Sequence, residues 1–136
     1  MSVPSPVAAL ARLMLALMFV MAGASKFANL EGTAGYIASG GLPMPAVLAV
    51  LTAALELLGG LALALGFQAR FAALALAVFT VVASLLFHKF WAVPAEQVMV
   101  QHLMFMKNIA VAGGLLFVFS LGAGPASLDN RRIAAA

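Results

Sequence analysis

Three ionisable residues, Arg12, Glu56 and Lys107, lie inside long apolar runs of this sequence, and Asn108 follows the last of them. A charged side chain near the centre of a bilayer costs roughly 2.5–3.5 kcal/mol on insertion scales, so it is expected to have a partner or a function. On a helical projection each charge shares its face with a glycine, a residue type that allows close contact with a neighbouring helix. The spacing predicts that all three charges point into one bundle, with Glu56 between Arg12 and Lys107.

Such a cluster suits a polar pocket for an anionic or carbonyl-bearing ligand, since two cations against one carboxylate leave a surplus positive charge. A quinone head group fits this chemistry: Lys107 and Asn108 would donate to a carbonyl oxygen, and Glu56 would carry protons. We therefore predict Glu56 and Lys107 as catalytic residues. Both are also predicted to bind the ligand, together with Arg12 and Asn108. Two alternatives stay open, a structural ion-pair network that fixes helix register and a pathway for small anions or protons.

The remaining polar residues give little support for metal chemistry. His88, His102 and Glu96 lack a ligand-type spacing, and neither histidine lies deep enough to be an axial haem ligand. The sequence contains no cysteine, which excludes thiolate metal sites, disulfide relays and thiol nucleophiles. We predict no metal site and no covalently bound cofactor. A redox role would therefore need a non-covalently bound cofactor or a diffusible quinone.

The segments that hold these residues are those of a membrane protein. Of 136 residues, 65% are hydrophobic and 8% are charged, whereas soluble domains are about 25% charged. The mean hydropathy is +1.16. This composition excludes a soluble enzyme and makes the lipid bilayer the first partner. In this context the net charge of +3 relates to topology and not to nucleic acid.

Four apolar runs, near residues 6–27, 45–67, 71–87 and 98–121, are long enough to cross a bilayer and lack the alternation of barrel strands. We predict an all-α integral membrane four-helix bundle, a single transmembrane domain over residues 1–136. The Gly-Gly pairs in 58–61 and 112–115 suggest a duplicated two-helix hairpin, although small residues at such positions also occur simply for close helix packing.

An even number of spans places both termini on one side of the membrane. Arg70, Arg131 and Arg132 would share that side, against Lys26 and Lys89 in the opposite loops. The positive-inside rule then predicts cytoplasmic termini, with residues 122–136 as a short cytoplasmic tail. Within this tail we expect residues 127–136 to be flexible. An alternative for the first run is a cleavable signal peptide that ends before residue 25.

Short segments in a fixed order resemble the DoxX family of small bacterial membrane proteins. They are Leu10–Leu13, Ala22–Phe27, Gly41–Pro43, Glu56–Gly60, Phe87–Trp91, Lys107–Ala110 and Gly113–Leu116. The resemblance implies a four-helix protein of the bacterial inner membrane with cytoplasmic termini. It also implies polar residues of the family signature at Arg12, Lys26, Glu56, Lys107 and Asn108, which adds Lys26 to the candidate ligand-binding residues.

The family is similar to a subunit of an archaeal thiosulfate:quinone oxidoreductase, and some relatives are linked to membrane complexes that handle sulfur compounds and oxidative stress. The resemblance therefore implies a quinone-interacting or accessory subunit of a membrane oxidoreductase system, with other membrane or redox proteins as partners. A homo-oligomer is a further expectation. The alternative from another class is a non-enzymatic membrane scaffold or assembly partner.

Overall fold

The computed structural model describes residues 5–136, and within them every regular element is a helix. Four helices are long and apolar enough to cross a membrane: α1 (Ser5–Ala28), α3 (Pro45–Leu65), α4 (Ala69–Phe87) and α5 (Ala95–Leu121). Three shorter elements connect or follow them, namely α2 (Leu30–Ser39), the 3-10 helix η1 (Phe90–Ala92) and α6 (Leu128–Ala134). The predicted all-α membrane bundle is confirmed.

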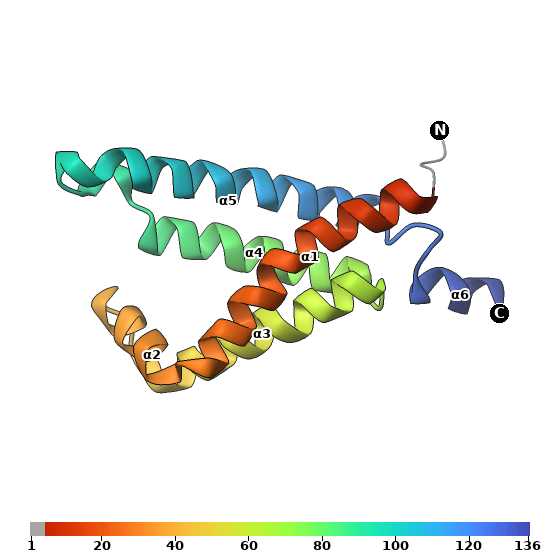
Figure 1. Cartoon of the computed structure of the whole chain (residues 1–136), viewed down its shortest axis with the longest axis horizontal. Helices are drawn as coiled ribbons and strands as arrows, with labels where there is room; N and C mark the ends of the chain where they lie inside the picture. The colour runs from red at the N-terminus through yellow and green to blue at the C-terminus, as the bar shows by residue number, and fades with distance from the viewer. Residues whose placement is uncertain (1–4) are drawn as a thin grey trace.

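The long helices form two antiparallel pairs. Helix α1 packs along α3, with α2 in the connection between them, and α4 packs along α5, with η1 in the connection. Figure 1 shows that the two pairs come together at the end where α1 begins and α6 lies, and separate toward the end that carries α2. The molecule is therefore closed at one end and splayed at the other.

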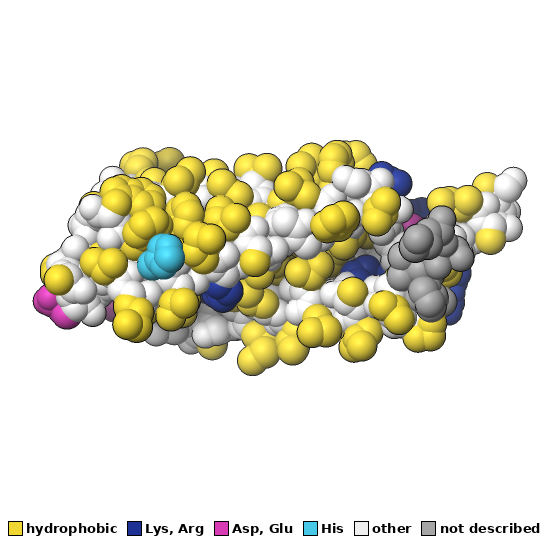
Figure 2. All heavy atoms as spheres, turned by 90° about the horizontal axis from the view of Figure 1, so that it is seen from above, with side chains coloured by type: hydrophobic (Ala, Val, Ile, Leu, Met, Phe, Trp, Pro, Cys, Tyr) yellow, Lys and Arg dark blue, Asp and Glu magenta, His cyan; other side chains and the backbone are white. Residues whose placement is uncertain are grey.

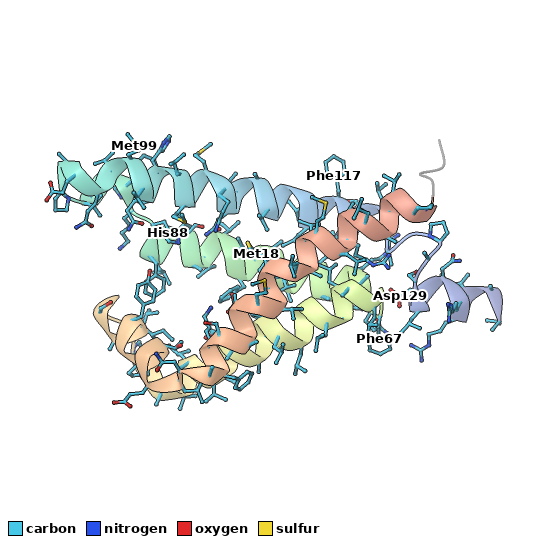
Figure 3. All side chains as sticks on the ribbon, in the orientation of Figure 1. Met18, Phe67, His88, Met99, Phe117 and Asp129 are labelled. Atoms are coloured by element: carbon cyan, nitrogen blue, oxygen red, sulfur yellow. The ribbon has the colours of Figure 1, made fainter. Side chains whose placement is uncertain are left out.

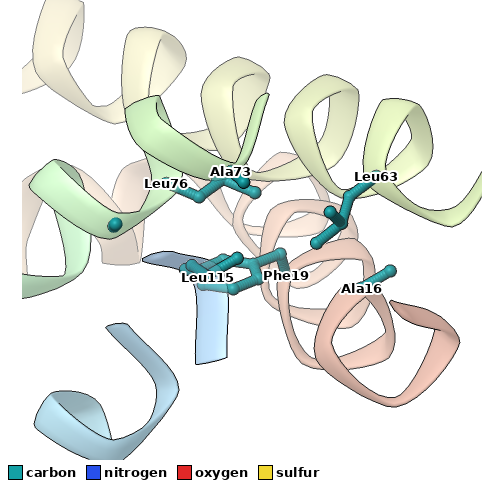
Figure 4. Close-up of a cluster of buried hydrophobic side chains, with 7 residues drawn as sticks. Ala16, Phe19, Leu63, Ala73, Leu76 and Leu115 are labelled. Atoms are coloured by element: carbon teal, nitrogen blue, oxygen red, sulfur yellow. The ribbon is translucent and has the colours of Figure 1, made fainter. Parts of the chain in front are cut away.

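A small apolar core fills the closed half of the bundle. Its buried side chains come from all four long helices and include Ala16, Phe19, Leu63, Leu76 and Leu115 (Figure 4). Three of its seven residues are alanine, and small residues allow the helices to approach closely. A Cβ atom on Gly23 of α1, for example, would lie 2.5 Å from the backbone nitrogen of an α3 residue. The core thus ties the two helix pairs together at one end only.

The two Gly-Gly pairs that suggested a duplication have different surroundings. Gly60 of α3 lies against Val20 within its own helix pair, whereas Gly114 of α5 lies near Leu15 of the other pair. A Cβ atom on Gly113 would meet no atom within 4 Å. At Gly60 and Gly114 the contacts therefore favour close packing by small residues over equivalent positions of a repeated hairpin.

Within the tail that the sequence suggested to be flexible, Leu128–Ala134 form the helix α6. Ser127 caps α6 by accepting from the backbone N–H of Asn130. Asp129 of α6 accepts from the backbone N–H groups of Gln68 at 2.8 Å and Ala69 at 2.9 Å, and so caps the start of α4 (Figure 3). This long-range cap fixes α6 against the turn between α3 and α4.

The outer surface suits a bilayer. On the face in Figure 2, apolar side chains predominate, and most of the basic side chains gather toward the end that carries the chain termini. Exposed apolar residues occur along every long helix. These helices therefore contact lipid directly.

Candidate functional site

A pocket of about 280 Å³ lies between the two helix pairs, in the splayed half of the bundle. Helices α1 to α5 all contribute to its wall, which is mostly apolar and includes the aromatic side chains of Phe79 and Phe87. Four of the five predicted site residues line it, namely Lys26, Glu56, Lys107 and Asn108. The structure thus brings together polar groups from three different helices at membrane depth.

Lys26 and Glu56 form an ion pair across the first helix pair. The Lys26 Nζ atom lies 2.5 Å from Oε2 of Glu56, and the carboxylate side chain is 7% exposed. No hydroxyl, amide or backbone N–H among the described residues donates a hydrogen bond to this buried oxygen. Lys26 is close to the end of α1, so its long side chain reaches back to a carboxylate that lies about 17 Å into α3.

Asn108 joins the second helix pair. Its side chain is buried, and Nδ2 donates to the hydroxyl of Ser84 at 2.8 Å. A side-chain amide has two N–H donors and a carbonyl oxygen, so this contact leaves a second donor at the pocket wall. Thr80, one turn before Ser84 and also in the wall, donates its hydroxyl to the carbonyl of Leu76. Its hydrogen is therefore engaged within α4.

Lys107 lies in the middle of α5, twelve residues after Ala95 and fourteen before Leu121. Its side chain borders the pocket and is exposed, unlike the buried position that the helical projection suggested. Among residues 5–136, no carboxylate lies within ion-pair distance of its ammonium group. The pocket therefore combines a neutralised pair, Lys26 and Glu56, with a cation that has no counter-charge in the described chain.

Arg12 does not join this group, and the expected approach of Arg12 to Glu56 is wrong. Its buried guanidinium donates to the backbone carbonyls of Ala123 and Ala126 beyond α5 and, at 3.4 Å, to Ala64 near the end of α3. Arg12 and Lys26 share one face of α1, but fourteen residues separate them by about 21 Å. The cation that reaches Glu56 is Lys26.

Sequence reasoning missed the contribution of α2 to the pocket. Tyr36 of α2 stacks on Phe87, the last residue of α4, with ring centroids 4.9 Å apart and an interplanar angle of 24°. His88 follows at the pocket rim, and its Nδ1 atom lies 2.9 Å from Oε1 of Gln101. A short helix of mixed polarity gives no hydropathy signal, so only the folded arrangement reveals these residues.

The histidines do not form a metal centre in the described chain. Within residues 5–136, no three His, Asp or Glu side chains gather closely enough to hold a metal ion. His102 instead packs edge-on against Phe90, with centroids 4.6 Å apart. The polar chemistry of the pocket therefore belongs to the ion pair, Lys107 and Asn108.

Comparison with known proteins agrees with this architecture. The sequence profile of the DoxX family matches residues 7–89, which include Lys26, Glu56 and His88 but end before Lys107 and Asn108. The chain is 31% identical over 122 residues to the inner membrane protein YphA of Escherichia coli K12, with 90% of this chain and 87% of the relative covered.

A second relative from the same organism, the inner membrane protein YqjF, is 37% identical over 120 residues, covering 88% of this chain and 87% of YqjF. No solved structure matches the chain. These relatives and the four apolar helices make it a multi-pass inner-membrane protein. The chain belongs to the DoxX family.

Proposed function

We propose that the pocket binds the head group of a quinone and that the protein serves as the membrane subunit of an oxidoreductase system. The observation that carries this proposal is a pocket at membrane depth in which Lys26, Glu56, Lys107 and Asn108 interrupt an apolar, partly aromatic wall. Ligand sites typically combine such a wall with a few polar groups that fix the orientation of the ligand. The volume of about 280 Å³ suits a ring-sized head group and leaves the isoprenoid tail in lipid.

In this proposal each polar residue has a distinct part. Lys107 and the free N–H of Asn108 donate to a carbonyl oxygen of the ring. Reduction of a quinone to a quinol consumes two electrons and two protons, and the electrons come from a partner redox protein. Glu56 is the acid or base at membrane depth that exchanges protons with the ring. Lys26 holds the Glu56 carboxylate and extends from it toward the end of α1.

We also propose that the termini face the cytoplasm. Arg70, Arg131 and Arg132 all belong to the closed end of the bundle, beside α6, whereas Lys89 lies at the opposite end. The positive-inside rule favours the cytoplasm for the end with more Lys and Arg. The splayed end with α2 and η1 then faces the other side of the membrane.

The scaffold hypothesis remains the second candidate, because the Lys26–Glu56 pair and the Asn108–Ser84 bond also serve to fix helix register. A continuous ion pathway has less support. It was predicted to run through Arg12, but the buried side chain of Ala16 lies between Arg12 and Phe19 along α1, and Phe19 forms part of the pocket wall.

Solvent extraction of the protein, purified in mild detergent, tests the proposal by measuring isoprenoid quinone per polypeptide. We expect about one quinone per wild-type chain, and much less in Glu56→Gln and Lys107→Met variants. Lys89→Met is the matched control, since it removes an exposed cation that does not border the pocket. Each variant must first give a single folded species.

Trace quinone at the same level in all four proteins would refute quinone binding. The Lys26–Glu56 pair would then have a purely structural role, and the scaffold hypothesis would replace the quinone proposal.

A further inference from the structure

We propose that the pocket exchanges its ligand with the lipid phase, through an opening between α1 and α5 beside Lys107, and that stacking of Tyr36 on Phe87 closes it toward water. The ligand is then a membrane-dissolved amphiphile with a hydrogen-bond-accepting or anionic head, and not a water-soluble anion. This inference rests on the proposed binding role of the pocket but does not require the ligand to be a quinone.

The opening follows from how α1 crosses α5. The two helices are close at Leu15 and Gly114, where a Cβ atom on the glycine would lie 3.2 Å from the leucine side chain. Toward its C-terminal end α1 diverges from α5 (Figure 1). Met18 of α1, labelled in Figure 3, borders the pocket beyond this crossing. Lys107 of α5 borders the same pocket. Lys107 both lines the pocket and is exposed on a membrane-spanning helix, so the pocket reaches the lipid-facing surface beside it.

The position of Lys107 indicates what the opening admits. An exposed ammonium halfway along a spanning helix meets acyl chains unless a polar group covers it, and it has no carboxylate partner in the described chain. A head group that enters the gap brings an acceptor or a negative charge to this ammonium while its tail stays in lipid. The Lys26–Glu56 pair, already neutralised, lines the same pocket.

The other side of the pocket is covered by α2. Phe87 is the last residue of α4 and lies near the end of the candidate span Ala69–Ala92. Tyr36 stacks on the Phe87 ring, and a Cβ atom on Gly40 would lie 2.6 Å from it, so the end of α2 sits directly against the same ring. Ile37, between these two residues, is buried and borders the pocket. This aromatic contact bridges the two helix pairs at the splayed end.

The absence of cysteine allows a direct test by single-cysteine labelling in proteoliposomes. An Ala83→Cys variant places a thiol in the pocket wall. It is treated either with a charged, water-soluble maleimide or with an apolar maleimide dissolved in the bilayer. Ala92→Cys, exposed on η1, and Ala73→Cys, in the core, are the accessible and inaccessible controls.

We expect the apolar reagent to label Ala83→Cys. The charged reagent should label Ala83→Cys at least about tenfold more slowly than Ala92→Cys, because moving a charged group from water into an apolar pocket costs free energy. Adding Tyr36→Ala should remove most of this difference. Two results would overturn the inference. One is rapid labelling of Ala83→Cys by the charged reagent with Tyr36 intact, and the other is no labelling by the apolar reagent.

A protection experiment tests the class of ligand. A fully substituted benzoquinone with a decyl chain, dissolved in the bilayer, should slow apolar labelling of Ala83→Cys, and Lys107→Met should abolish this protection. Thiosulfate in the aqueous phase should not protect, and protection by thiosulfate would overturn the inference. If labelling from lipid persists but the benzoquinone gives no protection, the proposed quinone function fails while access from lipid stands.

Discussion

Arg12 is predicted to hold the closed end of the bundle together and to have no part in ligand binding. Its guanidinium connects α1 to the end of α3 and to the loop after α5, with 2.7 Å between Nη2 and the carbonyl oxygen of Ala126. A second donor, Nη1, contacts the carbonyl of Ala123 closely. The two contacts to Ala64 are long, at 3.4 Å. Replacement by glutamine removes both short contacts, because the glutamine side chain ends at the position of the arginine Nε atom, two bonds short of the Nη atoms that make them.

The size of the loss follows from those two bonds. A hydrogen bond from a charged donor contributes about 1.5–3 kcal/mol. Ala126 is exposed, so its carbonyl regains water in the variant, and the lower end of that range applies to it. The expected loss for Arg12→Gln is therefore about 3 kcal/mol, or roughly a hundredfold in the folding equilibrium. Arg12→Lys should lose nearly as much, since an ammonium lacks the planar fork that spans two carbonyls.

Reversible unfolding in mixed micelles, titrated with a denaturing detergent, measures this loss. Arg131→Gln is the control, because it removes an exposed guanidinium from α6 at the same end of the protein. The quinone content of the folded Arg12→Gln fraction should equal that of wild type. A stability within about 0.5 kcal/mol of wild type would refute the reasoning. A stable variant without quinone would instead return Arg12 to the ligand site.

Three further predictions concern the helix contacts. Lys26→Met should destabilise the protein by about 3–5 kcal/mol, because it leaves a buried carboxylate without its partner. Glu56→Gln should destabilise it less, since the freed ammonium is 29% exposed near the end of α1. Equal losses of stability for the two variants in the unfolding titration would contradict this asymmetry. Gly23→Ala should lower the stability by about 1–3 kcal/mol, because the added methyl group forces α1 away from α3. Gly113→Ala, whose Cβ atom meets nothing within 4 Å, should leave the stability unchanged or raise it by up to about 1 kcal/mol. A loss of stability in both variants would show that helix packing is not the cause. Asp129→Asn should weaken the cap of α4 by about 1 kcal/mol. Hydrogen exchange at the first backbone amides of α4 should then become faster. Unchanged exchange at these amides would argue against the cap.

Much of the fold could be predicted from sequence, because lipid restricts a spanning chain to helices or closed barrels and each span is a long apolar run. The boundaries follow local signals. Helix α3 starts at Pro45, a residue suited to a first helical turn, and ends before Gly66, whose φ of 65° is left-handed. These features depend on neighbours in sequence, which is why they are readable without a structure.

The ion pair is harder to predict because it depends on the register of α1 against α3. Arg12 and Lys26 share a face of α1, so a helical projection cannot tell which one meets Glu56. The close contacts of Gly23 and Gly60 with the opposite helix fix how far one helix slides along the other. That register places Lys26, and not Arg12, at the level of the carboxylate.

The elements α2 and α6 lie outside what hydropathy detects. Helix α2 mixes Glu31, Thr33 and Tyr36 with apolar residues over only ten positions. Helix α6 is held by the contact of Asp129 with the start of α4, sixty residues earlier in the chain. Neither apolar run length nor local capping signals report a contact of that kind.

The location of the Lys26–Glu56 pair within the first helix pair has a consequence for biosynthesis. A lone carboxylate in the middle of α3 opposes insertion by roughly 2.5–3.5 kcal/mol. Its counter-ion is on the preceding span, which leaves the ribosome first, so α1 and α3 can enter the membrane as a neutral hairpin before α4 and α5 are made. The second hairpin, formed by α4 and α5 with the cation of Lys107, then packs against an α1–α3 pair that is already in the membrane.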